Sequence, residues 1–103
     1  MTFSTIVNAI NKAEKYPHLI KIGIFGSYAR GDANETSDVD IIFEYDHSSV
    51  EYLEDIDDFM EDMELDIPVK IDYVTLNALQ DGETDHFTEN ILGEVKWIYV
   101  KQA

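Results

Sequence analysis

Two segments of alternating apolar residues, 19–25 (LIKIGIF) and 39–45 (VDIIFEY), constrain the fold of this chain more than any other feature. Successive side chains of a β-strand point to opposite faces of its sheet, so alternation predicts a strand with one buried face. A polar stretch that opens with Gly26-Ser27 connects the two segments. The residues expected on the buried faces are Ile20, Ile22, Ile24, Val39, Ile41, Phe43 and Tyr45.

One helix is predicted before the first of these strands in the sequence, and another after the second strand. Ser4 is placed to cap a helix over residues 5–15, which Pro17 would end because proline disfavours helical backbone in the residue before it. Ser48–Glu51 (SSVE) matches a capping box and predicts the start of a second helix. The apolar residues that recur at helical spacing along it are Leu53, Ile56, Met60 and Met63.

The remainder of the chain predicts two more strands. Pro68 is followed by the strand-like segment Val69–Val74, and another strand is expected over Val95–Val100. Between them, Leu76–Leu92 is polar and helical in pattern, with a break near Asp81-Gly82.

Length and composition limit the class of protein. At 103 residues, 45% hydrophobic and 28% charged, we expect one folded domain over residues 1–103. The apolar runs are short, and the N-terminus lacks the pattern of a signal peptide, so we expect a cytoplasmic protein without membrane contact. The chain has no cysteine, which excludes disulfides and thiolate metal ligands.

The chain is strongly acidic, with 22 Asp and Glu residues against 7 Lys and Arg residues and a net charge of −15. Direct binding of a nucleic-acid polymer is not expected, because that requires a basic surface. A single nucleotide can still bind when divalent cations supply positive charge. Much of the acid lies in residues 51–64, where two interpretations stay open: a solvated helix face, or a docking surface for a basic protein.

The segment GSYARGDANETSDVD, residues 26–40, contains the first candidate site residues. Asp38 and Asp40 are two residues apart in a predicted strand, so their side chains share the face opposite Val39. Carboxylates at this spacing can hold one or two divalent ions, and Mg²⁺ favours oxygen ligands completed by substrate phosphates. The turn at Gly26 and Ser27 lets the backbone approach a phosphate closely and adds a hydroxyl donor.

Asp72, in the segment VKIDYV, is the third candidate acid. It lies opposite the apolar face formed by Val69, Ile71 and Tyr73. If its strand neighbours the second strand, three carboxylates converge, as two-metal phosphoryl or nucleotidyl transfer requires. Asp72 would then bind a metal and take a proton from the attacking hydroxyl. The competing interpretation is that Asp-x-Asp in so acidic a chain marks only a solvated strand end.

The order of a strand, Gly-Ser, a ten-residue gap and Asp-x-Asp entering the next strand resembles the DNA polymerase β-like nucleotidyltransferase superfamily. Within it, GSYARGDANETSDVDIIFE and KIDYVTLNAL are most similar to the minimal nucleotidyltransferases. The resemblance extends from Leu19 to about Val100. It implies an α+β fold in which a mixed sheet of about four strands carries helices mainly on one face.

The resemblance also implies roles for the candidate residues. Gly26 and Ser27 would hold the triphosphate of ATP, while Asp38 and Asp40 would hold Mg²⁺ or Mn²⁺. Asp72 would be the third catalytic and metal-binding acid. For Arg30 two roles stay open, a phosphate contact and a structural salt bridge with a nearby carboxylate.

Minimal nucleotidyltransferases are antitoxin partners of HEPN-type ribonuclease toxins, so the resemblance implies a hetero-oligomer with such a toxin. In those systems the enzyme transfers AMP from ATP to a toxin tyrosine. Superfamily members that modify small molecules usually carry a second, helical domain, for which a chain ending at Ala103 leaves no room. Two alternatives stay open: an antitoxin that acts by binding alone, and a small-molecule nucleotidyltransferase whose acceptor site forms across a homodimer.

Overall fold

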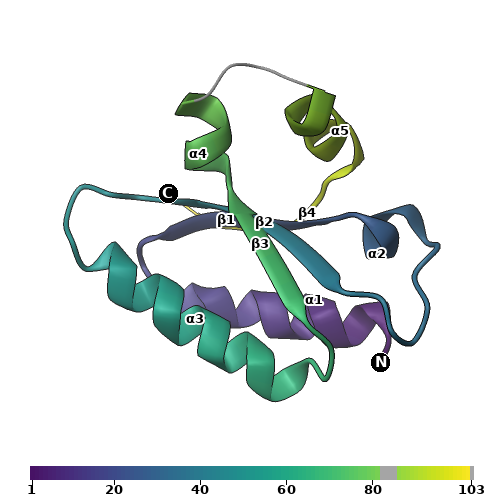
Figure 1. The fold of residues 1–103 in the computed structure, drawn as a ribbon. Coiled ribbons are helices and arrows are strands. Elements are labelled where there is room, and N and C mark those ends of the chain that lie inside the picture. Colours follow the sequence, from purple (N-terminus) through teal and green to yellow (C-terminus); the bar gives the residue numbers. More distant parts are fainter. Residues whose placement is uncertain (82–85, 103) are drawn as a thin grey trace.

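The computed structural model describes residues 1–81 and 86–102, which form a four-stranded mixed sheet flanked by helices (Figure 1). The sheet has the strand order β3-β2-β1-β4. β1 pairs antiparallel with β2 and with β4, whereas β2 and β3 run parallel. The strands are β1 (Leu19–Phe25), β2 (Val39–Tyr45), β3 (Ile71–Thr75) and β4 (Lys96–Val100). The expected α+β fold with a mixed sheet of about four strands is confirmed.

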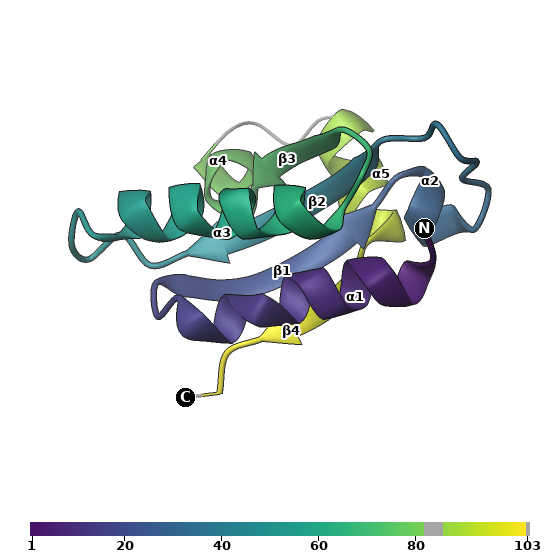
Figure 2. The same cartoon turned by 90° about the horizontal axis from the view of Figure 1, so that it is seen from below.

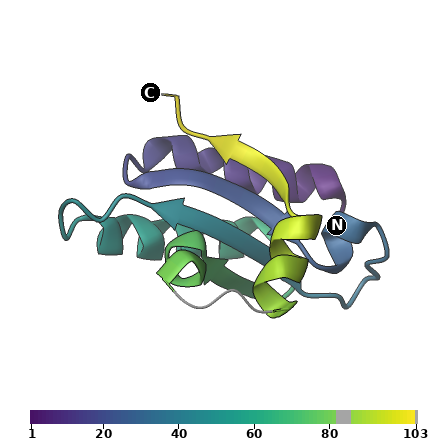
Figure 3. The same cartoon turned by 90° about the horizontal axis from the view of Figure 1, so that it is seen from above.

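The helices lie in two layers. Helices α1 and α3 lie side by side on one face of the sheet, as expected (Figure 2). Helices α4 and α5 lie over the opposite face (Figure 3). Within residues 1–81 and 86–102, no helix is long and apolar enough to span a bilayer. The helices are α1 (Phe3–Asn11), the 3-10 helix η1 (Lys12–Lys15), α2 (Ser27–Arg30), α3 (Tyr52–Asp66), α4 (Leu76–Asp81) and α5 (His86–Glu94).

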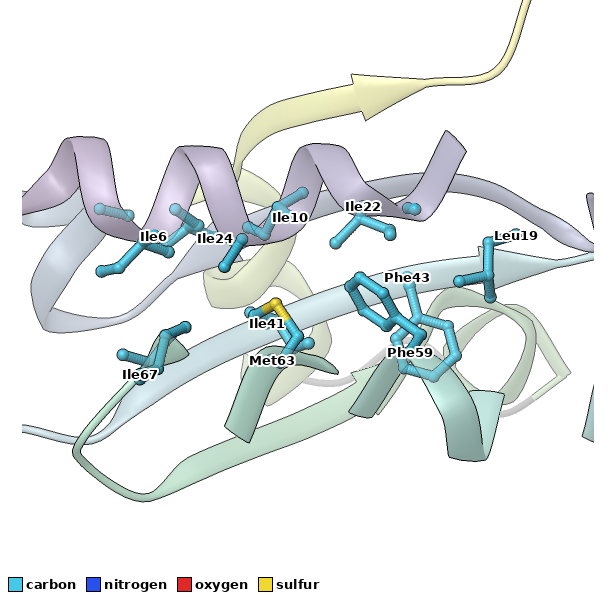
Figure 4. Packing of buried hydrophobic residues seen from close by; sticks show 14 residues of the cluster. Ile6, Ile10, Leu19, Ile22, Ile24, Ile41, Phe43, Phe59, Met63 and Ile67 are labelled. Carbon is cyan, nitrogen blue, oxygen red and sulfur yellow. The ribbon is translucent and has the colours of Figure 1, made fainter. Parts of the chain in front are cut away.

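The larger of two hydrophobic clusters, here called the main core, fills the space between the sheet and helices α1 and α3 (Figure 4). The alternation predicted for β2 is confirmed, because Val39, Ile41 and Phe43 are fully buried in this cluster and Tyr45 packs against it. A smaller cluster on the other face, here called the minor core, contains Ile42, Leu76 and Ile91. The main-core residues are Ile6, Ala9, Ile10, Ala13, Leu19, Ile22, Ile24, Ala29, Val39, Ile41, Phe43, Phe59, Met63 and Ile67.

The start of β1 departs from the predicted alternation. A β-bulge lies between Leu19 and Lys21, which pair with the successive β2 residues Tyr45 and Glu44. One inserted residue reverses the alternation, so Leu19 is fully buried whereas Ile20 is only partly buried. The prediction for Ile22 and Ile24 is confirmed and that for Ile20 is wrong.

The first helix begins earlier than predicted. Its N-cap is Thr2, whose hydroxyl accepts a hydrogen bond from the backbone N–H of Thr5 at 3.3 Å, so the prediction of Ser4 as the cap is wrong. Both are hydroxyl residues at the same helix end, and the sequence pattern alone does not separate them. The α-helix ends at Asn11, and η1 continues to Lys15 before Pro17.

The predicted capping box at the start of α3 is wrong. The helix begins at Tyr52 with Glu51 as its N-cap, and no side chain caps it. Ser48 instead donates its backbone N–H to Asp46 Oδ1 at 2.9 Å in the preceding turn. This local turn takes the place of the predicted cap.

The buried face of α3 is also rotated from the predicted one. Phe59 and Met63 are fully buried, Ile56 and Met60 are partly buried, and Leu53 is exposed. Leu53 therefore does not belong to the core, whereas Phe59, outside the predicted set, is one of its largest residues.

The later elements fall close to their predicted positions. β3 starts at Ile71, two residues after the predicted start at Val69, and β4 covers Lys96–Val100. The predicted helical region forms two helices, the first of which ends at Asp81, while Gly82 lies outside the described residues.

Candidate active site

Asp40 and Asp72 occupy neighbouring positions on the parallel strands β2 and β3. The register pairs Asp40 with Asp72 on one side and with Phe25 of β1 on the other. Residues in register on adjacent strands share a face of the sheet, and here that face is the one covered by α4 and α5, opposite Val39. The predicted adjacency of the two acids is confirmed.

Asp38 immediately precedes β2 at the same end of the sheet. The backbone N–H of Val39 donates to the carbonyl of Lys70 at 2.9 Å, which fixes this end of β2 against the segment that enters β3. Asp38, Asp40 and Asp72 are all partly buried. The fold therefore gathers the three predicted acids at one end of the sheet.

The local environment raises the pKa of Asp40. Burial of its carboxylate is the largest cause, followed by the negative charges of Asp72 and Asp38. The positive charge of Arg30 acts in the opposite direction and is a smaller effect. Since like charges disfavour ionisation, a cation placed among these carboxylates would be favoured.

Gly26 packs directly against Asp40. It has a φ of +74°, and a Cβ atom built on it would lie 2.3 Å from Asp40 Oδ2. Both the backbone conformation and the lack of space therefore require glycine at this position. This close approach sets the turn at the end of β1 beside the carboxylate on β2.

Ser27 and Arg30 follow in the short helix α2. The carbonyl of Ser27 accepts hydrogen bonds from Gly31 and Asp32, each at 3.0 Å, which close this turn. Arg30 Nη1 lies 3.2 Å from Glu94 Oε2, and its Nε donates to Asp32 at 3.3 Å. The salt bridge considered for Arg30 is thus present, and its partner in α5 had no signal in the sequence.

A cleft of about 420 Å³ joins the turn after β1 to α5. Asp38 and Asp72 do not line the cleft, although the charges of both act on Asp40. Another cleft of about 430 Å³, lined in part by Met1, Tyr28 and Pro68, contains none of the candidate residues. Because the cleft beside α5 contains the candidate residues Gly26, Ser27, Arg30 and Asp40, we take it as the candidate active site. Its lining residues are Phe25, Gly26, Ser27, Arg30, Asp40, Phe87, Asn90, Ile91 and Glu94.

The donor set fits a hard divalent cation only in part. Within residues 1–81 and 86–102, no three His, Cys, Asp or Glu side chains are arranged to hold a metal ion by themselves. Carboxylate oxygens are nevertheless the ligands that Mg²⁺ prefers, and Mg²⁺ commonly completes its shell with substrate phosphates. A metal ion at Asp40 would therefore need oxygens from a bound nucleotide in addition to those of the protein.

The family model for the nucleotidyltransferase domain matches residues 5–98. The chain belongs to the nucleotidyltransferase domain family. This nucleotidyltransferase is 31% identical over 80 residues to the protein adenylyltransferase MntA of Thermococcus cleftensis, covering 76% of this chain and 73% of the relative. It is 40% identical over 60 residues to a Methanocaldococcus jannaschii protein named for the same activity, covering 56% of this chain and 65% of that relative.

Solved structures share the fold of this nucleotidyltransferase. A structure described as a minimal nucleotidyltransferase aligns with a TM-score of 0.68 and 24% identity, covering 93% of this chain and 95% of the other. A toxin-antitoxin structure solved with AMP-PNP aligns with a TM-score of 0.66 and 20% identity, covering 93% and 74%. Both confirm that the arrangement of strands and helices is the nucleotidyltransferase fold.

Proposed function

We propose that this nucleotidyltransferase transfers AMP from ATP to a tyrosine hydroxyl of a partner HEPN-type ribonuclease toxin and so acts as its antitoxin. One observation carries the proposal: Asp40 lies in register with Asp72 and packs against the Gly26 turn at the edge of an open cleft. The names of the relatives as protein adenylyltransferases, and the toxin-antitoxin structure with AMP-PNP, support it.

The proposal gives each site residue a role. The triphosphate lies along Gly26 and Ser27, with Arg30 within reach of its charge. Asp38, Asp40 and Asp72 would hold Mg²⁺ or Mn²⁺ together with oxygens of the bound nucleotide. When bound, the metal neutralises the phosphates and stabilises the charge that develops during transfer.

The transfer needs one proton acceptor, and we assign that role to Asp72. Its carboxylate takes the proton of the tyrosine hydroxyl as the hydroxyl oxygen bonds to the α-phosphorus of ATP. The bond from the α-phosphorus to the oxygen that bridges the α- and β-phosphates breaks, and pyrophosphate leaves. The products are an AMP-tyrosine ester on the toxin, pyrophosphate and a proton on Asp72.

The charge of the chain supports a basic protein as the acceptor. A net charge of −15 favours encounter with a positively charged surface, such as that of a protein that binds RNA. The acceptor hydroxyl then comes from the partner chain, in a hetero-oligomer.

The test is the mass of the toxin after incubation with this chain and ATP. With Mg²⁺ or Mn²⁺ we expect the toxin to gain the mass of one adenylyl group (AMP less one water), and a chelator should abolish the gain. Asp40→Asn should also abolish it. Glu14→Gln, which removes one carboxylate from an exposed position of η1, serves as the control and should leave it intact. An unmodified but inhibited toxin in every sample would show that the chain acts by binding alone.

A further inference from the structure

Glu94, the last residue of α5, bonds to the turn that holds Gly26. Its Oε1 accepts a hydrogen bond from the backbone N–H of Gly26 at 2.8 Å, and its Oε2 lies 3.2 Å from Arg30 Nη1. The side chain is only 26% exposed. One carboxylate therefore engages both a backbone donor and a cation at the edge of the candidate cleft.

The local electrostatic environment disfavours a carboxylate at this position. The last turn of a helix carries partial negative charge from its free carbonyl groups, so a carboxylate at this end is disfavoured. Glu94 also adds negative charge near Asp40, where it acts in the same direction as Asp38 and Asp72. Its contacts with Gly26 and Arg30 must therefore offset both repulsions.

The two groups that Glu94 holds are suited to a phosphate. Backbone N–H groups and guanidinium groups form the same charge-assisted hydrogen bonds with phosphate as with carboxylate oxygens. Arg30 is the only arginine of the chain, and both groups line the cleft. A phosphate group and the Glu94 carboxylate cannot occupy these donors at the same time.

We propose that Glu94 is an internal anion that occupies the phosphate end of the cleft and that the nucleotide displaces from Gly26 and Arg30. Glu94 thereby lowers the affinity of the site for nucleotide. This inference rests on the proposed function, because it assumes that the triphosphate binds along Gly26. Ile91, buried in the minor core, keeps α5 in place while the side chain of Glu94 is released.

The experiment measures the Kd of AMP-PNP with Mg²⁺ by calorimetry for the intact chain and three variants. Glu94→Gln removes the charge and keeps the size of the side chain, and we expect it to tighten binding about tenfold, equivalent to ~1.4 kcal/mol. Glu94→Asp keeps the charge but is one methylene shorter, so it should also tighten binding. Glu89→Gln removes one charge from an exposed position of the same helix and should leave the Kd unchanged.

The outcomes separate this inference from the proposed function. If the intact chain binds AMP-PNP and Glu94→Gln binds it equally or more weakly, the inference fails and the proposed function stands. If the Kd of Glu94→Asp equals that of the intact chain, only the charge at this position affects nucleotide binding, and the inference that the nucleotide displaces the Glu94 side chain is wrong. Loss of folded structure in Glu94→Gln, detected by circular dichroism, would show that the contacts of Glu94 with Gly26 and Arg30 are required for folding, and would overturn the inference. If neither the intact chain nor any variant binds nucleotide, both proposals fail together.

Discussion

The hydroxyl of Tyr16 donates a hydrogen bond to the carboxylate of Asp62, joining the segment after α1 to the middle of α3. Lys15 lies 3.0 Å from the same carboxylate, and Asp55 accepts the backbone N–H of His18 at 2.9 Å. The carboxylates of α3 therefore form two rows. The inner row, Asp55 and Asp62, contacts the segment between α1 and β1. The residues of the outer row are exposed, and they include Glu54, Asp57, Asp58, Glu61 and Glu64.

The inner row should make stability depend on pH at both extremes. The hydrogen bond from Tyr16, followed by that from Lys15, lowers the pKa of Asp62 below its ordinary 3.8. The folded chain then keeps this charge at lower pH than the unfolded chain. The stability it adds is present above about pH 3.8 and is lost as the pH falls through the lowered value.

At alkaline pH the same pair acts through Tyr16. Burial, followed by the hydrogen bond to Asp62, raises the pKa of Tyr16 from 10.0 to about 12. Its contribution to stability is present below pH 10 and lost as the pH rises toward 12. Urea unfolding across this range should show a shallower alkaline loss for Tyr16→Phe and a shallower acid loss for Asp62→Asn. Asp57→Asn is the control, and equal slopes in all variants would contradict the assignment.

Asp40 should reduce the stability of the chain in the absence of metal. Its raised pKa means that the folded state disfavours the charged form, so stability falls as the pH rises from 3.8 through the raised value. At pH 7 and with a chelator present, Asp40→Asn and the double variant Asp38→Asn/Asp40→Asn should have thermal midpoints at or above that of the intact chain. If the double variant unfolds, the pair is structural and the site assignment is wrong.

The outer row of α3 should speed the association of a basic partner. The rate of association with that partner should fall steeply with added salt, because salt screens exposed charges, while the dissociation rate changes less. Reversing Glu54, Asp58 and Glu61 to lysine should slow association in the same way. Surface plasmon resonance with the toxin measures both rates. An association rate that is indifferent to salt would leave this row as a solvated face.

Asp72→Asn should separate transfer from binding. Asparagine keeps the shape of the side chain but cannot accept the proton, so transfer should slow by about a hundredfold or more, typical of a lost general base. The variant should still form a complex with the toxin, and toxin activity should return after the complex is dissociated. Toxin treated with the intact chain should stay inactive after separation. If both toxins recover equally, the inhibition is not covalent.

The positions of Asp40 and Asp72 relative to each other could be predicted from the sequence because both lie on strands. Alternation in a buried strand fixes which side chains share a face, so Asp40 had to lie opposite Val39 once β2 formed. The approach of Asp72 depended on the condition that its strand neighbours the second strand, and the register shows that this condition is met. Family membership, expected from the Gly-Ser and Asp-x-Asp motifs, is confirmed by the match over residues 5–98.

The opposite wall of the cleft could not be predicted in this way. Glu94 is one acid among 22 Asp and Glu residues, and only the packing of α5 brings it to Gly26. Likewise, the sequence gives no sign of the bulge that leaves Ile20 only partly buried, because Leu19 and Ile20 are both hydrophobic. Both features are consequences of tertiary contacts, which local patterns do not record.

The unequal size of the two cores implies that helices α4 and α5 unfold locally more often than the rest of the fold. Elements with few buried contacts exchange their amide hydrogens through local openings that leave the rest folded. The described residues of α4 and α5 rest on a minor core of three buried residues, whereas α1 and α3 share fourteen with the sheet. Amides of residues 86–94 should therefore exchange faster than those of β2. Asp40, which lies on β2, would keep its position during such local openings of α5.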